Sequence, residues 1–189
     1  MQSRYESMNA PIPPTDIRTI YKGRLFTVQV ETVTLPKGHV LHADVIRHPG
    51  SVVLVPITEA GEVILVRQYR PAIGRWVWEL PAGSLATGEE PDAAAMRECH
   101  EEIGLVPARL ERLGAFYPTP GYCDELMNFY LATGLREPEA DEHAAQDEDE
   151  DIETEAFSRA ALAGMIQRGE IIDLKTLAGL ALSATGVRS

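Results

Sequence analysis

Four glutamates and an arginine lie close together in one stretch of the chain, and their types and spacing could hold a metal ion. Glu98, Glu101 and Glu102 follow Arg97, and Glu89 comes eight residues before that arginine. In an α-helix with about 3.6 residues per turn, the three later glutamates would share one face. Like charges on one face lower helix stability unless a counter-ion is close. A hard divalent cation such as Mg²⁺ binds carboxylate oxygens, so the stretch predicts a magnesium site.

Neighbouring residues could complete such a site. Arg97 lies four residues before Glu101 and could pair with it and orient it. Gly83 could permit a backbone turn in which the carbonyl of Ala82 faces inward as a further ligand. The alternative is a solvated, salt-bridged helix face, which is the commonest explanation of a charge run considered alone.

The sequence around these glutamates indicates the element that carries them. Pro91–Ile103 has a proline in its first turn and Gly104 just after its end, which together predict a helix. Met96, Cys99 and Ile103 have helical spacing and would form its buried stripe, with the glutamates in part on the opposite face.

Strands are predicted on both sides of this helix. Residues 51–57 and 62–69 flank a glycine-containing turn and are predicted to pair as a hairpin. Residues 17–46 predict an N-terminal hairpin or small sheet. The further elements expected are strands at 113–117 and 126–132 and helices at 158–168 and 174–182. This mixed order predicts an α/β or α+β sandwich.

The spacing of the acidic stretch resembles the Nudix box. The pattern Gly-x5-Glu-x7-Arg-Glu-aliphatic-x-Glu-Glu-x-Gly-aliphatic runs from Gly83 to Leu105 without a gap. Its one departure is Cys99 at an aliphatic position, where a buried cysteine acts as a small hydrophobe. The resemblance implies an α/β Nudix fold: an α/β/α sandwich with a mixed sheet, plus a small N-terminal antiparallel β-sheet. It also implies a hydrolase that cleaves a nucleoside diphosphate linked to another group.

The resemblance implies metal-binding and catalytic residues as well. The metal would be Mg²⁺, with Mn²⁺ as the alternative, and its ligands would be Ala82, Glu98, Glu101 and Glu102. Glu101 would also take part in catalysis. In an acidic run further along, Glu148 best matches the loop position of the general base, and Glu150 is second. Most of that run could instead be solvated loop.

Segments outside the box narrow the substrate. Residues 67–71, 78–83 and 117–121 resemble the ADP-ribose pyrophosphatase branch of the family, and Pro120 follows Leu105 by fifteen residues. The resemblance implies Mg²⁺-dependent hydrolysis of ADP-ribose to AMP and ribose 5-phosphate. The implied substrate-binding residues are Arg70, Glu79 and Glu125. The alternatives are a surface arginine on a strand for Arg70 and a cap or salt-bridge partner for Glu125.

Two other functions stay open on the sequence alone. Residues 148–153 and 173–176 resemble the nucleotide-sugar branch about as well, so GDP-mannose is an alternative substrate. The third hypothesis is a non-catalytic nucleotide-sensing module on the same fold. Such modules usually lose carboxylates of the box, whereas this chain keeps all of them.

Composition restricts the partners and the compartment. The chain has 189 residues, 17 basic and 29 acidic, with a net charge of −12. This charge disfavours nucleic acid and anionic membranes, which need a basic surface. No apolar stretch is long enough to span a membrane or to form the core of a signal peptide. Two cysteines suit a reducing cytoplasm.

The resemblance also implies a domain organisation. Residues 1–47 would be an N-terminal arm and β-sheet, and residues 48–189 the Nudix hydrolase domain. The N-terminal strands are similar to strands that pair or swap between subunits in this branch. The expected assembly is therefore a homodimer.

Overall fold

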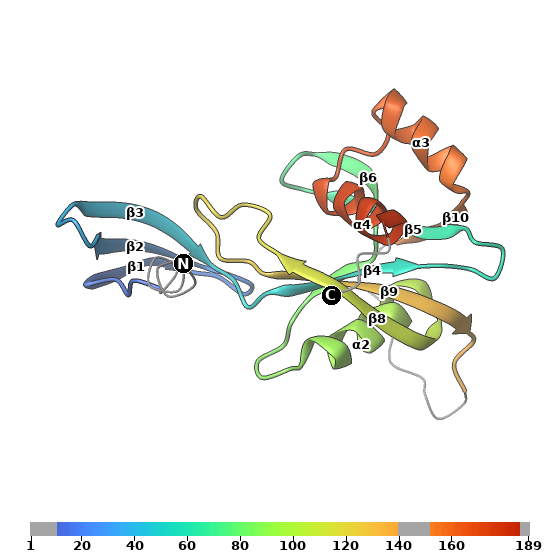
Figure 1. The fold of residues 1–189 in the computed structure, drawn as a ribbon, viewed down its shortest axis with the longest axis horizontal. Coiled ribbons are helices and arrows are strands. Elements are labelled where there is room, and N and C mark those ends of the chain that lie inside the picture. The colour runs from blue at the N-terminus through green and yellow to red at the C-terminus, as the bar shows by residue number, and fades with distance from the viewer. Residues whose placement is uncertain (1–10, 140–151, 186–189) are drawn as a thin grey trace, which may run out of the picture. The chain divides into compact units, whose positions relative to one another are not determined.

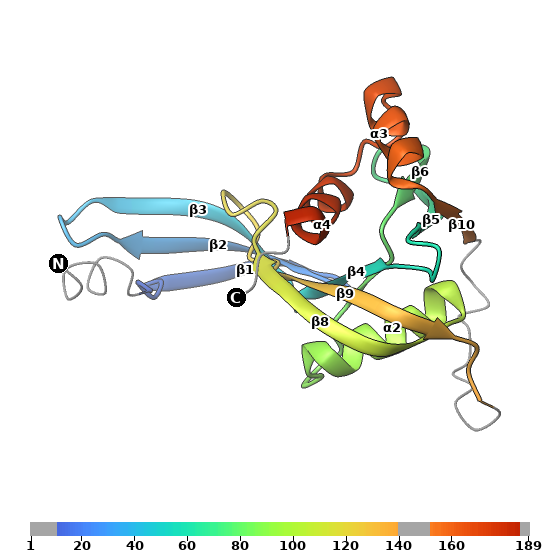
Figure 2. The ribbon, with the colours of Figure 1, turned by 45° about the vertical axis from the view of Figure 1, so that its right-hand side comes forward.

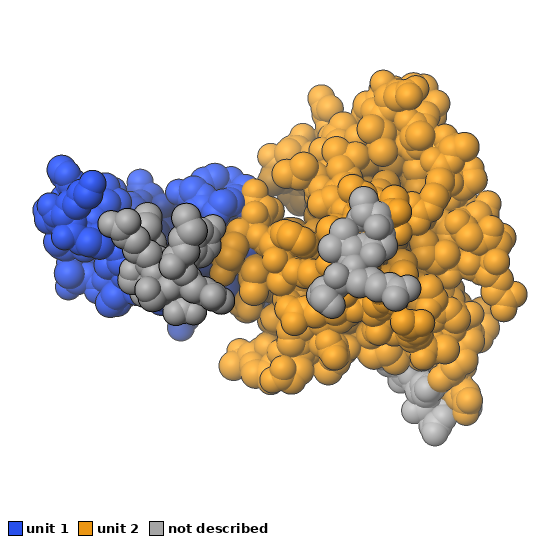
Figure 3. Space-filling model, viewed as in Figure 1, with its two compact units in different colours: residues 1–48, 119–125 blue, residues 49–118, 126–189 orange. Residues whose placement is uncertain are grey.

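The computed structural model describes residues 11–139 and 152–185 (Figure 1). The chain divides into two compact units (Figure 3). One unit contains residues 1–48 together with 119–125, and the other contains residues 49–118 and 126–189. No helix in the described ranges has the length and apolar character needed to cross a membrane.

The smaller unit is built on a three-stranded antiparallel sheet. Its strands, in the order β1-β2-β3, are β1 (Asp16–Lys22), β2 (Thr27–Thr34) and β3 (Val40–Arg47). Gly38, with a φ of 83°, lies in the tight turn between β2 and β3. Residues 119–125 join this sheet through a bridge between Ile46 and Cys123. The small N-terminal antiparallel sheet expected from the sequence is therefore present.

The larger unit contains two further sheets. The mixed sheet has the order β7-β4-β9-β8, with β4 (Ser51–Pro56), β7 (Ala82–Ser84), β8 (Val106–Phe116) and β9 (Met127–Arg136). The antiparallel sheet has the order β10-β5-β6, with β5 (Val63–Arg70), β6 (Arg75–Glu79) and β10 (Glu153–Phe157).

The hairpin predicted for residues 51–57 and 62–69 is wrong. β4 and β5 lie in different sheets and are joined only by an isolated bridge between Ile57 and Val63. The reason is that β4 already has a neighbour on each edge, since it pairs in parallel with β9 and antiparallel with β7. The turn closes as predicted, but the strand after it continues into the other sheet.

Helices cover the mixed sheet on both sides. α2 (Pro91–Ile103) packs Ala94, Ala95 and Cys99 against Val52 and Leu54 of β4. The alternate residues of β4 face the second core cluster, which includes α3 (Arg159–Arg168) and α4 (Leu174–Thr185). Figure 2 shows α2 on one side and α3 and α4 on the other. This is the α/β/α sandwich expected from the sequence.

The predicted stripe of α2 is wrong at Met96. The helix has the predicted bounds and ends at Gly104 in the left-handed conformation, but Met96 is 39% exposed. The buried residues of the helix are Ala94, Ala95, Glu98 and Cys99. Small residues let the helix lie close to β4, so Glu98 faces the sheet rather than the opposite side. The carboxylate therefore lies on the buried face of its helix.

Candidate active site

Glu98 of α2 and Gly83 of β7 lie in direct contact. A Cβ added to Gly83 would lie 1.9 Å from Cδ of Glu98, a distance that no real structure tolerates. Gly83 lies in the middle of strand β7, paired with Val52, so the backbone turn predicted at this residue is wrong. Glycine is needed here because the missing side chain leaves the space that the carboxylate of Glu98 occupies.

Arg97 is the centre of the acidic group. Its Nη1 donates to Glu98 at 2.6 Å and, as the i,i+4 spacing predicts, to Glu101 at 2.7 Å. Its Nε and Nη2 bond the two oxygens of Glu89, each at 2.9 Å. Nη2 also lies 3.3 Å from the carbonyl oxygen of Ser84. One guanidinium therefore gathers three of the glutamates of the box.

The fourth glutamate, Glu102, is held from the sheet side. Its Oε2 accepts from the backbone N–H of Ala82 at 2.9 Å, and its Oε1 accepts from Nε2 of Gln68 at 3.2 Å. Sequence reasoning missed Gln68. The sequence did hold a signal for it: Gln68 lies in the 67–71 segment, two residues before Arg70, so the two side chains point to the same face of β5.

The electrostatics of the group reflect burial and crowding. Burial raises the pKa of Glu98 above its ordinary value, although hydrogen bonds from Arg97 act in the opposite direction. Glu89 is more exposed, and its hydrogen bonds from Arg97 lower its pKa. The same hydrogen bonds raise the pKa of Arg97, so it stays charged. Four carboxylates accompany this one guanidinium, which leaves an excess of negative charge.

The donor set fits a hard divalent cation. The group offers carboxylate oxygens and an excess of negative charge at a half-buried position, which Mg²⁺, Mn²⁺ and Ca²⁺ prefer. Within the described ranges, no three acidic, histidine or cysteine side chains are already arranged around a metal position. Arg97 instead bonds oxygens of Glu98 and Glu101. Metal binding would require these carboxylates to turn partly away from the guanidinium.

Arg70 and Glu79, both predicted to bind substrate, bind each other. Arg70 donates to the two oxygens of Glu79 at 2.6 and 2.8 Å. The side chain of Glu79 is only 2% exposed, whereas that of Arg70 is 41% exposed. Of these two residues, only Arg70 is open to a ligand.

The remaining predicted residues lie elsewhere. Glu125 belongs to the smaller unit, where its Oε1 lies 4.0 Å from Nδ1 of His48. Glu148 and Glu150 lie outside the described residues. The roles predicted for all three stay predictions.

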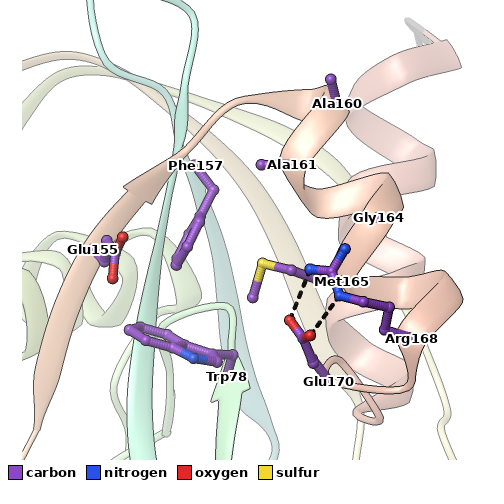
Figure 4. A pocket seen from close by; sticks show the side chains of 9 residues that line it. All are labelled: Trp78, Glu155, Phe157, Ala160, Ala161, Gly164, Met165, Arg168 and Glu170. Carbon is purple, nitrogen blue, oxygen red and sulfur yellow. Dashed lines mark hydrogen bonds and ion pairs between the residues drawn. The ribbon is translucent and has the colours of Figure 1, made fainter.

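A hollow in the larger unit lies between α3, β6 and β10 (Figure 4). Trp78 and Phe157 meet edge to face in it, with ring centroids 5.1 Å apart. Arg168 and Glu170 form an exposed ion pair at its rim. None of the predicted site residues lines this hollow, so it is separate from the acidic group.

Comparison with known proteins shows which proteins this chain is similar to. A family model described as the NUDIX domain matches residues 47–179. An ADP-ribose pyrophosphatase of Bacillus subtilis is 36% identical over 83% of this chain and 84% of its own length. An ADP-ribose pyrophosphatase of Mycobacterium tuberculosis is 37% identical over 86% of this chain and 78% of its own.

Two further proteins are similar at lower identity. A GDP-mannose pyrophosphatase of Citrobacter koseri is 31% identical over 72% of this chain and 78% of its own length. A crystal structure described as an ADP compounds hydrolase superposes with a TM-score of 0.78 at 22% identity, covering 93% of this chain and 94% of the other. At that identity the superposition shows a shared fold.

Proposed function

The chain belongs to the Nudix hydrolase family, and on this premise we propose that it hydrolyses the pyrophosphate bond of ADP-ribose to AMP and ribose 5-phosphate. The observation that carries the chemistry is the gathering of three glutamates on Arg97, with Glu102 beside them on the N–H of Ala82. The choice of substrate rests on two relatives named as ADP-ribose pyrophosphatases, which match more of the chain at higher identity than the GDP-mannose relative does.

A divalent metal ion is part of this proposal. We assign Mg²⁺, or Mn²⁺, to the ligands Ala82 (through its carbonyl), Glu98, Glu101 and Glu102. When bound, such an ion supplies positive charge to the diphosphate and lowers the pKa of the attacking water. The chain contributes the positions of the ligands: Gly83 leaves space for Glu98, and Gln68 orients Glu102.

A carboxylate must accept the proton of the attacking water. The proposed groups are Glu101, whose Oε2 lies 2.7 Å from Nη1 of Arg97, and Glu148 or Glu150. If Glu148 is the base, Glu148→Gln should lower kcat by about 10²–10⁴ with little change in KM. Wild-type turnover in that variant would remove Glu148 from the mechanism.

Arg70 and Glu125 are proposed to bind the ribose-phosphate part of the substrate. The guanidinium of Arg70 is partly exposed, and guanidinium groups bind phosphate oxygens with well-defined geometry. Glu125 accepts hydrogen bonds as a carboxylate and could bind ribose hydroxyls.

A nucleoside diphosphate sugar such as GDP-mannose is the second candidate substrate. The observation in its favour is the relative named GDP-mannose pyrophosphatase. Both substrates place a diphosphate between a nucleoside and a sugar, so the acidic group would perform the same chemistry on either.

A homodimer in the cytoplasm is also part of the proposal. The sheet of the smaller unit carries large apolar side chains that are about half exposed: Ile17, Ile20, Tyr21, Val40 and Leu41. Exposed apolar side chains gathered on one small sheet are a frequent site of self-association. Light scattering coupled to size exclusion should give twice the 20.8 kDa chain mass, and a monomer at micromolar concentration would contradict the dimer.

Turnover of a small panel tests the proposed substrate. ADP-ribose, GDP-mannose and ADP-glucose are each incubated with Mg²⁺, and phosphate is measured after phosphatase treatment of the products. We expect the highest kcat/KM for ADP-ribose and no turnover in EDTA. A higher kcat/KM for GDP-mannose than for ADP-ribose would make GDP-mannose the preferred substrate. No turnover of any of the three compounds would contradict the proposed hydrolase activity.

A further inference from the structure

A buried carboxylate in the larger unit binds two cations from different elements. Glu79 ends β6 and is 2% exposed. Arg70 of β5 bonds its two oxygens through Nε and Nη2. Lys175, in the first turn of α4, bonds its Oε2 through Nζ and is itself only 9% exposed. Such a carboxylate cannot reach a ligand without displacing Arg70 or Lys175.

Lys175 is in turn held at the beginning of α4. Its Nζ lies 3.0 Å from Oδ2 of Asp173. The same oxygen caps the helix by accepting from the N–H of Thr176 at 3.0 Å and from its hydroxyl at 2.6 Å. The N–H of Leu80, next to Glu79, donates to that hydroxyl at 2.8 Å. The first turn of α4 is thus fixed to the end of β6 by two separate contacts.

Arg70, on the other side of Glu79 from Lys175, keeps part of its guanidinium available to a ligand. In the part of the chain that the structure describes, Nη1 of Arg70 has no hydrogen-bond partner, and the side chain is 41% exposed. Arg70 follows Gln68 by two residues on the same face of β5, and Nε2 of Gln68 lies 3.2 Å from Oε1 of Glu102, so this guanidinium lies beside the acidic group. Arg70 can therefore offer a donor to an anion bound near those glutamates.

We propose that Lys175 is a positioning residue, which fixes the carboxylate of Glu79 and through it turns the free side of Arg70 toward a phosphate oxygen of the substrate. Glu79 is then a support for Arg70 rather than a substrate contact. The bidentate pair of Arg70 and Glu79 can turn as a unit about the terminal bond of Glu79, whereas the ammonium of Lys175 holds Oε2 from a second direction and fixes the orientation of the pair. The inference rests on the proposed function, because it assigns a phosphate to Arg70.

A double-mutant cycle on binding of ADP, measured by calorimetry with Mg²⁺ present, tests this coupling. Arg70→Met should weaken binding about tenfold, and Lys175→Met about fivefold. If Lys175 acts through Arg70, the double variant should bind no more weakly than Arg70→Met alone. Additive losses would overturn the inference, because Lys175 would then contact the ligand itself. Unchanged affinity in Lys175→Met, or a wild-type protein that does not bind ADP, would also overturn it.

Further variants separate positioning from folding. Arg168→Met removes one positive charge from an exposed pair in the same unit and should leave ADP affinity unchanged. Lys175→Arg should restore most of the affinity, and its kcat should stay near wild type while KM follows the affinity. If Lys175→Met does not fold, Lys175→Gln replaces it in the cycle. Equal losses in Lys175→Met and Arg168→Met would overturn the inference.

Failure of the proposed function has a different result. A protein that binds ADP and shows the non-additive cycle, yet hydrolyses no nucleoside diphosphate compound, would contradict the activity and leave the role of Lys175 standing. A protein that hydrolyses ADP-ribose but shows additive losses in the cycle would support the activity and contradict the role of Lys175.

Discussion

Two clusters of charge in the larger unit are built from the same residue types with different balances. The cluster around Glu79 contains two acids and two cations. The cluster around Arg97 contains one cation bonded to three glutamates, with Glu102 beside them. Both include a buried carboxylate, Glu79 in one and Glu98 in the other.

The difference separates a supporting cluster from a binding one. A buried carboxylate with enough cations is complete without a ligand, and removing a partner is costly. A buried carboxylate that shares one guanidinium with two other glutamates is short of positive charge, and burial raises the pKa of Glu98 accordingly. We therefore expect the Glu79 cluster to govern stability and orientation and the Arg97 cluster to govern metal binding and catalysis.

Neutralising an acid of the Arg97 cluster should have the largest effect. Glu98→Gln and Glu102→Gln each remove a proposed metal ligand and should lower kcat/KM by about 10²–10³ or more. The melting temperature of Glu98→Gln without metal should not fall, because a buried charge is lost. Glu90→Gln changes an exposed acid at the beginning of α2 and serves as the control. Activity near wild type in Glu98→Gln would remove that residue from the site.

A methyl group at Gly83 should act almost as strongly. Gly83→Ala would place its Cβ 1.9 Å from Cδ of Glu98, so the carboxylate must move. A displacement of about 1 Å at a catalytic group can cost about 10² in rate, and we expect that loss in kcat/KM. Gly164→Ala, in α3, meets only the flexible tip of Arg168 and should keep full activity. Equal activity of the two variants would show that the carboxylate of Glu98 can move away from residue 83 without loss of function.

The box itself could be predicted because its chemistry is local in sequence. The spacing from Gly83 to Leu105 predicts that Glu98, Glu101 and Glu102 share one helix, and the bounds of that helix agree with its proline and glycine signals. The buried face could not be predicted, because a hydrophobic stripe assumes that charged residues point to solvent. At the functional site the opposite holds, since the charged Glu98 faces the sheet and the apolar Met96 is exposed.

Partners distant in sequence were missed for a different reason. Gln68 is 34 residues from Glu102, and Lys175 is 96 residues from Glu79. No periodicity or local signal links such pairs, since only the packing of β5 and α4 brings them to their partners. The wrong hairpin between β4 and β5 has the same origin, because both edges of β4 are taken by strands later in the chain.

Neutralising Glu79 should lower stability, in contrast to Glu98. Glu79→Gln leaves two cations facing a neutral amide at a buried position, and we expect a loss of about 2–3 kcal/mol in the free energy of unfolding. The partial exposure of Arg70 keeps the loss at the lower end of the range for buried pairs. Urea unfolding measures it, with Glu170→Gln of the exposed Arg168 pair as the control. If Glu79→Gln and Glu98→Gln had the same stability, the contrast between the clusters would be lost.

Gln68 should affect metal binding and not stability. Gln68→Leu removes the donor that orients Oε1 of Glu102, and loss of such a support typically weakens metal binding by about tenfold. Calorimetric titration with Mn²⁺ measures the change. Gln167→Leu, on the exposed side of α3, should bind Mn²⁺ as wild type does. Equal Mn²⁺ affinities in the two variants would mean that the N–H of Ala82 is sufficient to orient Glu102.

The smallest effect expected is on the pH dependence of stability in the metal-free protein. Burial raises the pKa of Glu98 above its ordinary 4.5, so the folded state binds this proton more tightly than the unfolded state. The resulting stability is present below pH 4.5 and is lost as the pH rises through the raised pKa. Glu98→Gln lacks this group. The difference in melting temperature in EDTA, variant minus wild type, should therefore increase as the pH rises.

The lowered pKa of Glu89 has the opposite sign, since its stabilising effect is lost as the pH falls below 4.5. Glu89 is present in both proteins, so its contribution largely cancels when the two melting curves are subtracted. Calorimetry across the acid range therefore isolates Glu98. A difference that stays flat or shrinks as the pH rises would mean that Arg97 compensates the buried charge fully, and the Arg97 cluster would then be as balanced as the one around Glu79.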